Sequence, residues 1–166
     1  MRFLWFSAAV LAGAALFAER VPKAVNAADQ VPTSRETSTP VTTITGAASE
    51  IVRGADSHFY VDAQVNGATI RMLIDTGASI VALTRADALA AGIAAGPGEF
   101  SAEGVGVGGT VRLKPVTIDR LAVGSLAANA VPAVVVEDTL PVSLLGQSYL
   151  SRLTSVEIKG DRLVLR

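Results

Sequence analysis

The chain has 166 residues, of which 50% are hydrophobic and 17% are charged, and its net charge is −1. This length suits one domain plus an extension, and the balanced charge excludes the basic surface of nucleic-acid-binding proteins, so we expect no nucleic-acid partner. There is no cysteine and one histidine, His58, which excludes disulfides, thiolate zinc sites and histidine-rich metal sites.

The first 18 residues, "MRFLWFSAAVLAGAALFA", carry one charge, Arg2, before a weakly polar to apolar run from Phe3 to Ala18. As a helix, this run would span about 24 Å, somewhat less than the ~30 Å hydrocarbon core of a bilayer. It is predicted to be an uncleaved membrane anchor, which its length and flanks favour, or a signal segment cut after Ala27. The flanking Lys and Arg residues would place the downstream part of the chain in the cytoplasm, whereas the short basic head is typical of export.

Residues 19–49 change in composition to Pro, Thr and Ser, as in "VPTSRETSTPVTTITGAAS". Three prolines and the lack of any hydrophobic period predict an extended linker. The folded domain is therefore expected over residues 50–166.

Alternating apolar residues on both sides of Asn66-Gly67 predict the first hairpin of this domain, because Asn-Gly is the strongest short-range signal for a two-residue hairpin turn. The alternating positions are Phe59, Val61, Ala63, Val65, Ile70, Met72 and Ile74.

The rest of the domain reads as short strands and two helical patches. After an apolar run at 80–83, Thr84 is a suitable N-cap and Gly92 a suitable end for a first helix. The other expected elements are a Gly-rich hairpin over 96–113, two strands around Gly124-Ser125, a helix in "LLGQSYLSRL" over 144–153 and a terminal hairpin around 159–161. We therefore expect a mostly β fold with a closed or nearly closed sheet and one or two short helices.

The stretch "RMLIDTGASIVALT" places Asp75 directly after an apolar strand. A carboxylate next to a buried strand is costly unless it is paired or used. It could be the first residue of a β-turn, but the apolar run before it favours a functional role. A rigid strand would fix the carboxylate, Gly77 would allow a sharp turn with amides nearby, and the Thr76 hydroxyl could bond to an equivalent loop.

A second element, "LLG" at 144–146, lies about seventy residues downstream. Together with "LIDTGAS", "VALT" and "GVGVGG", it makes residues 50–166 resemble the retropepsin-like (clan AA) aspartic proteases. The chain is most similar to small single-domain proteases of Gram-negative bacteria that carry an N-terminal membrane segment and a linker. The resemblance implies a closed β-barrel, no cofactor or metal, and an inner-membrane anchor with the protease domain in the periplasm, or an exported protein if the segment is cleaved.

Peptide hydrolysis of this type uses two carboxylates, one as base and one as acid. The sequence holds no second Asp-[Thr/Ser]-Gly triplet. Asp75 is therefore expected to meet Asp75 of a second chain across a two-fold axis in a homodimer, with Thr76 and Gly77 supporting the loop and with activity at mildly acidic pH.

The glycine-rich "GVGVGG" at 104–109 could cradle a phosphate, but that site needs a following helix, whereas "TVRLKPVTI" alternates and contains Pro115. A flap over an extended peptide fits better. The expected substrate-binding residues are Ala78, Gly106, Val107 and Gly108. The flap has no tyrosine, although Phe100 lies just before it.

Some features have a structural interpretation. His58 is expected at the surface or at a strand edge, and Glu137-Asp138 is expected to be solvated. The residues Leu153, Val156, Ile158, Leu163 and Leu165 could be core or dimer contact.

The function expected from the sequence is an aspartic endopeptidase that cleaves extended protein segments and could process its own linker. Its alternatives are a catalytically silent peptide-binding β-barrel of the cell envelope and a structural envelope domain.

Overall fold

The computed structural model describes residues 44, 46–106, 109–137 and 140–166. The predicted membrane segment 1–18 and nearly all of the predicted linker lie outside this part of the chain. No helix in the described part is long and apolar enough to cross a membrane. The elements, in chain order, are β1 (Ser49–Val52), β2 (Tyr60–Val65), β3 (Ala68–Ile74), β4 (Val81–Leu83), α1 (Arg85–Ala90), β5 (Ala102–Gly106), β6 (Gly109–Val123), β7 (Leu126–Val136), β8 (Ser143–Leu145), α2 (Gln147–Leu150), β9 (Val156–Lys159) and β10 (Arg162–Leu165).

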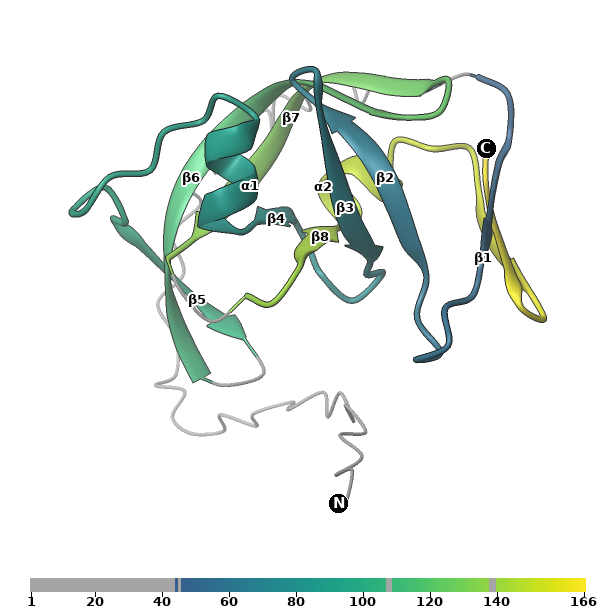
Figure 1. Ribbon diagram of the computed structural model, residues 1–166, viewed down its shortest axis with the longest axis horizontal. Helices are drawn as coiled ribbons and strands as arrows, with labels where there is room; N and C mark the ends of the chain where they lie inside the picture. Colours follow the sequence, from purple (N-terminus) through teal and green to yellow (C-terminus); the bar gives the residue numbers. More distant parts are fainter. Residues whose placement is uncertain (1–43, 45, 107–108, 138–139) are drawn as a thin grey trace, which may run out of the picture. The chain divides into compact units, whose positions relative to one another are not determined.

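The larger sheet closes on itself (Figure 1). Its strand order is β2-β3-β8-β4-β7-β6-β5, and β2 also pairs with β6 through Gln64↔Ala122 and Val65↔Leu121. The ring from β2 round to β6 is therefore a closed barrel, which leaves β5 outside it. Inward-pointing residues such as Met72, Leu121 and Val135 are fully buried and form the core. The predicted mostly β fold with a closed barrel and two short helices is confirmed.

The hairpin turns lie where the sequence predicts them. Asn66 and Gly67 join β2 to β3 with φ of 50° and 90°, which is the left-handed pair that a two-residue type I′ turn requires. Gly124 has φ of 57° between β6 and β7, and Gly160 has φ of 58° between β9 and β10. The local turn chemistry therefore sets three strand registers.

A second, three-stranded sheet has the order β1-β10-β9 (Figure 1). Its inner face continues into the core through Ile51, Leu163 and Leu165, while Leu153 is buried beside it. Ile158 pairs with Leu163 in the same row, on the edge strand β9, and is 56% exposed, whereas Ile51 at the opposite edge of that row is buried. The terminal segment is thus mostly core, with Ile158 as its exposed large apolar residue.

The first helix, α1, matches its prediction. The Thr84 Oγ1 accepts a hydrogen bond from the Asp87 amide at 3.1 Å, and Gly92 follows the helix with φ of 73°. This N-cap satisfies one of the amides that a helix start leaves free.

The second helix, α2, is shorter than predicted. The expected helix over 144–153 is wrong at its start, because Leu144 and Leu145 form β8 and pair with Leu73 and Ile74 of β3. Their backbone groups serve the sheet, so the helix begins only at Gln147. Tyr149 and Leu150 are buried, as their spacing suggests.

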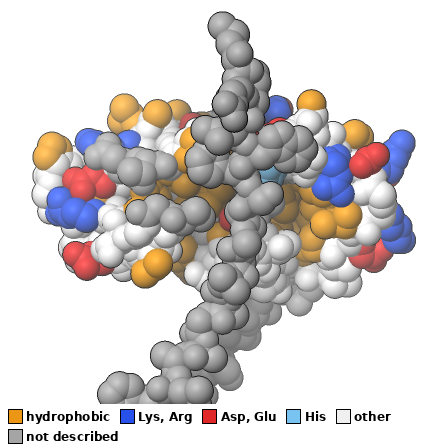
Figure 2. Space-filling model, turned by 90° about the horizontal axis from the view of Figure 1, so that it is seen from below, with side chains coloured by type: hydrophobic (Ala, Val, Ile, Leu, Met, Phe, Trp, Pro, Cys, Tyr) orange, Lys and Arg blue, Asp and Glu red, His pale blue; other side chains and the backbone are white. Residues whose placement is uncertain are grey.

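The lower side of the barrel in Figure 1 carries the β3–β4 loop. Viewed from that side, apolar side chains gather along the middle of the face and charged side chains lie toward its two ends (Figure 2).

Candidate active site

Asp75 is the first residue after β3, and the parallel strand β8 fixes its backbone. Ile74 pairs with Leu145, and the Asp75 amide donates to the Leu145 carbonyl at 3.2 Å. The strands on both sides of this pair are part of the closed barrel. The carboxylate is therefore attached directly to a strand of the closed barrel, as the apolar run before it indicates.

The "LLG" segment crosses the Asp75 loop at close range. Leu144 of β8 pairs on its other side with Ala82 of β4, so β8 lies between the strands that enter and leave the loop. A Cβ on Gly146 would lie 2.3 Å from the Ile80 carbonyl oxygen and 2.8 Å from that of Ala78. Only glycine allows this crossing, which explains the glycine of the motif.

Within the loop, two backbone amides donate hydrogen bonds to Asp75. The Gly77 amide donates to Asp75 Oδ1 at 2.9 Å, and the Ala78 amide donates to the Asp75 carbonyl at 3.3 Å. Asp75 is half-buried, whereas Thr76 and Gly77 are exposed. The carboxylate is thus held by one amide and remains partly accessible to solvent.

Three polar residues that the sequence analysis does not single out connect β8 and α2 to the Asp75 loop, to β4 and to the start of α1. Gln147 donates its side-chain amide to the Thr76 carbonyl at 2.9 Å. The Ser148 hydroxyl accepts from the Val81 amide and donates to the Pro132 carbonyl. Ser143, fully buried, accepts from the Thr84 amide and donates to the carboxylate of Asp87 at 2.5 Å.

The sequence offers a signal for two of these residues. Gln147 and Ser148 directly follow the "LLG" segment that crosses the Asp75 loop.

The glycine-rich segment forms the β5–β6 hairpin, with Gly106 opposite Gly109. Val105 is 92% exposed, which suits a projecting flap. Val107 and Gly108 lie outside the described residues. The phosphate-loop interpretation is wrong, because the 15-residue strand β6 follows the glycines where a nucleotide site would need a helix.

The base of this hairpin is fixed by charged groups. Lys114 bonds to the Glu99 carboxylate at 2.8 Å, and this contact, with the Gly96 amide, lowers the pKa of Glu99. Phe100 is 2% exposed, with the Arg85 guanidinium 5.5 Å from its ring centre. Phe100 therefore belongs to the core and cannot replace a flap tyrosine.

Two other sequence features lie at the surface. His58 is exposed, as expected, and its Nδ1 lies 3.5 Å from an oxygen of Asp56. A hydrogen bond from the Tyr60 hydroxyl lowers the pKa of Asp56. Glu137 is half-buried and pairs with Arg112 at 3.2 Å, so it is less solvated than expected, while Asp138 lies outside the described residues.

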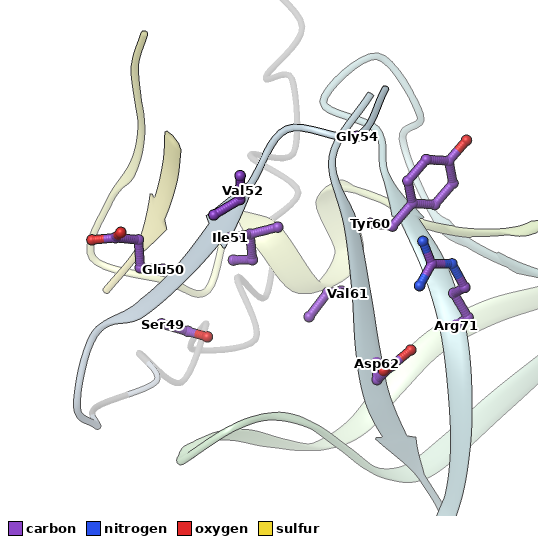
Figure 3. A pocket seen from close by; sticks show the side chains of 9 residues that line it. All are labelled: Ser49, Glu50, Ile51, Val52, Gly54, Tyr60, Val61, Asp62 and Arg71. Atoms are coloured by element: carbon purple, nitrogen blue, oxygen red, sulfur yellow. The ribbon is translucent and has the colours of Figure 1, made fainter. Parts of the chain in front are cut away.

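A groove of about 400 Å³ separates β1 from β2 (Figure 3). Ile51 and Val61 face its centre from the two strands, while Glu50 is directed toward β10, where it pairs with Arg162. No residue of the Asp75 loop lines this groove. In the described part of the chain, no group of three or more His, Asp or Glu side chains could hold a metal ion.

A closed β-barrel that presents an Asp-Thr-Gly loop braced by a crossing Leu-Leu-Gly segment is the arrangement that the resemblance to retropepsin-like aspartic proteases implies. The family model described as "gag-polyprotein putative aspartyl protease" matches residues 61–152, more than half of the chain. The chain belongs to this family of retropepsin-like aspartic proteases.

A solved structure, the retropepsin-like aspartic protease from Rickettsia conorii, is 31% identical. It aligns with a TM-score of 0.66 over 73% of this chain and 100% of that one. An uncharacterized protein of Rickettsia prowazekii (strain Madrid E) is 33% identical over 115 residues, which are 69% of this chain and 49% of that protein. An uncharacterized protein from the cobV 5′ region of Sinorhizobium sp is 35% identical over 112 residues, 67% of this chain and 48% of that protein. The chain thus spans about half the length of these two curated relatives.

Proposed function

We propose that this protein is an aspartic endopeptidase in which Asp75 supplies the catalytic carboxylate. The observation that carries the proposal is the half-buried Asp75 side chain, which the Gly77 amide holds at 2.9 Å and which sits on a loop braced by β8. Family membership supports a protease. The assignment of Asp75, Thr76 and Gly77 rests on their place in this loop.

The reaction needs a second carboxylate close to the first. One carboxylate takes a proton from a water molecule, whose oxygen attacks the carbonyl carbon of the scissile peptide, and the other donates a proton to the leaving nitrogen. Because close like charges cannot both ionise, the two groups share one proton. We therefore expect activity at mildly acidic pH.

The second carboxylate is proposed to be Asp75 of another copy, since the sequence contains a single Asp-Thr-Gly loop. The exposed Thr76 would then face the equivalent residue of its partner. Ile158, apolar and 56% exposed on the outer strand β9, supports an interface near the terminal hairpin. Such an interface would be isologous, with the same surface contributed by both copies.

The proposed substrate is an extended segment of a protein. The β5–β6 hairpin is the proposed flap, and Gly106, which pairs with Gly109, has no side chain to hinder an approaching chain. Ala78 lies directly after the catalytic loop. Main-chain bonds of this kind add the substrate as one more strand, and closure of a flap excludes water from the reaction.

The proposed location is the inner membrane, with residues 1–18 as the anchor and the protease domain in the periplasm. The support is the apolar run of the sequence and its short basic head. Deletion of residues 1–18 should move the protein from the membrane fraction to the soluble fraction, and external protease should reach the full-length protein only after the outer membrane is opened. Retention of the truncated chain in the membrane would contradict the anchor.

The central experiment compares peptide cleavage, including cleavage within residues 19–49, by the full chain and by Asp75→Asn. Asp62→Asn is the matched control, because Asp62 is an exposed aspartate on the neighbouring strand β2. We expect loss of cleavage only in Asp75→Asn. Equal cleavage by both variants, or none by wild type at any pH although it dimerises, would favour a silent binding module.

A mixing experiment tests the shared dyad. If each dimer draws one carboxylate from each chain, an equal amount of Asp75→Asn should roughly halve the activity per wild-type chain after exchange of subunits. Sedimentation of the full chain under the same conditions should show a dimer. Activity that is unaffected by the variant, in a protein that sediments as a monomer, would overturn the proposed dyad.

A further inference from the structure

Gln147 contacts the Asp75 loop twice, with its backbone and with its side chain. Its backbone amide donates to the Ala78 carbonyl at 2.8 Å, and its Nε2 donates to the Thr76 carbonyl at 2.9 Å. These are alternate carbonyls of the same loop. One residue thus holds the loop at two points.

The second contact leads directly to the carboxylate. The Thr76 carbonyl and the Gly77 N–H belong to the same peptide unit, which is planar. That N–H donates to Asp75 Oδ1 at 2.9 Å. The Gln147 side chain is therefore separated from the Asp75 carboxylate by one rigid plane with a hydrogen bond on each side. Hydrogen bonds in series polarise and align one another.

Gln147 belongs to a helix that is anchored in the core. It is the first residue of α2, and Tyr149 in the same helix is fully buried with its hydroxyl bonded to the Leu126 carbonyl at 2.7 Å. Thr76, by contrast, is exposed, so water could satisfy its carbonyl if the side chain were absent. The contact is thus not needed to satisfy a buried group, and its specific effect is on the orientation of the peptide plane.

We propose that Gln147 is a positioning residue: its side-chain amide holds the Thr76–Gly77 peptide so that the Gly77 N–H stays on Asp75 Oδ1. This inference rests on the proposed role of Asp75. Loss of the amide lets the plane rotate and leaves the carboxylate less well held. Because the Gln147 amide contacts the loop and not the substrate, its loss lowers kcat and leaves KM nearly unchanged.

The test uses Gln147→Met, which keeps the length of the side chain but has no donor, and Gln147→Glu. The matched control is Gln64→Met, since Gln64 also donates from Nε2, to Thr69 Oγ1 at 2.7 Å, in the exposed β2–β3 hairpin. The full chain is assayed for kcat and KM against a peptide substrate across the acidic range. Hydrogen exchange of the Gly77 amide, measured by NMR, provides a readout that does not depend on activity.

We expect Gln147→Met to lower kcat about tenfold and to speed Gly77 exchange about tenfold, the effect of losing roughly one hydrogen bond. KM should change less than about twofold. Gln147→Glu should approach wild-type kcat as the pH falls, because a protonated carboxyl can donate to the Thr76 carbonyl and an ionised one cannot. Gln64→Met should match wild type in every readout.

Two results would overturn the inference. One is wild-type kcat and wild-type Gly77 exchange in Gln147→Met. The other is faster exchange throughout α2 together with no recovery of Gln147→Glu at low pH, which would make the residue merely structural. If wild type cleaves no peptide while Gly77 exchange still responds to Gln147→Met alone, the proposed function fails and the positioning contact stands.

Discussion

Gly146→Ala tests whether the crossing of β8 over the Asp75 loop depends on the missing side chain. Gly146 has φ of −99°, which any residue can adopt, so space alone decides the outcome. The added Cβ would lie 2.3 Å from the Ile80 carbonyl oxygen, 2.7 Å from its carbon and 2.8 Å from the Ala78 oxygen. All three are backbone atoms, and none can move aside as a flexible side chain would.

The cost depends on what must move. Overpacking of a well-packed site costs about 1–3 kcal/mol. Separating the loop from β8 also stretches the Asp75–Leu145 and Gln147–Ala78 hydrogen bonds, each worth about 1 kcal/mol. We therefore expect Gly146→Ala to lower the free energy of unfolding by about 3–5 kcal/mol, and to abolish cleavage wherever the protein still folds.

The assay is urea unfolding, followed by circular dichroism, of wild type, Gly146→Ala and the control Gly106→Ala. A Cβ on Gly106 would meet its nearest atom, in the Val111 side chain, at an ordinary 3.7 Å, so this variant should unfold near the wild-type midpoint. A loss below about 1 kcal/mol for Gly146→Ala, no larger than an ordinary surface substitution, would refute the argument that the crossing excludes a side chain.

Tyr149→Phe should lower the free energy of unfolding by about 1–3 kcal/mol, because the buried Leu126 carbonyl loses its partner; chemical denaturation measures this. Burial raises the pKa of Tyr149 to about 12, so the wild type should lose stability as the pH rises from about 10 toward 12, and Tyr149→Phe should not show this loss. The hydrogen bond from Lys114 lowers the pKa of Glu99 in the folded protein below 4.5. The ionised Glu99 therefore contributes stability above pH 4.5, and this contribution is lost as the pH falls through the pKa of Glu99 in the folded state. Glu99→Gln should remove that small, salt-sensitive part of the acid dependence in thermal melts. Ser143→Ala should lower the free energy of unfolding by about 1–3 kcal/mol, since it leaves a partly buried amide and a carboxylate without their hydroxyl partner, and an unchanged melting temperature would contradict this.

The features that the sequence predicts well are those set by turn and cap residues close together in the chain. The Asn66-Gly67 turn, the Thr84 cap and the Gly160 turn each depend on residues within a few positions of one another, so their signals are complete in the sequence. The position of Asp75 is also readable, because an apolar strand leads into it. These features set the first hairpin, the start of α1, the terminal hairpin and the position of the loop that carries the proposed site.

The features that the sequence does not show depend on contacts between residues that are far apart in the chain. The apolar neighbours of Leu145 suit both a strand and a helix. Leu145 forms a strand because it pairs with Ile74 of β3. Ile158 and Leu163 look alike in the sequence, and only the packing of the three-stranded sheet on the core distinguishes the exposed Ile158 from the buried Leu163. Gln147 directly follows the "LLG" segment, but the bond from its side chain to the Thr76 carbonyl depends on how β8 crosses the loop, which the sequence does not show.

The long separation between Asp75 and Leu145 has a consequence for folding. The bond between them closes a loop of about seventy residues, and pairings of such long range form slowly because loop closure must precede them. During synthesis from the N-terminus, β8 and α2 cannot brace the Asp75 loop until they have emerged, about seventy residues after Asp75. The proposed site is therefore incomplete for as long as this stretch is being made.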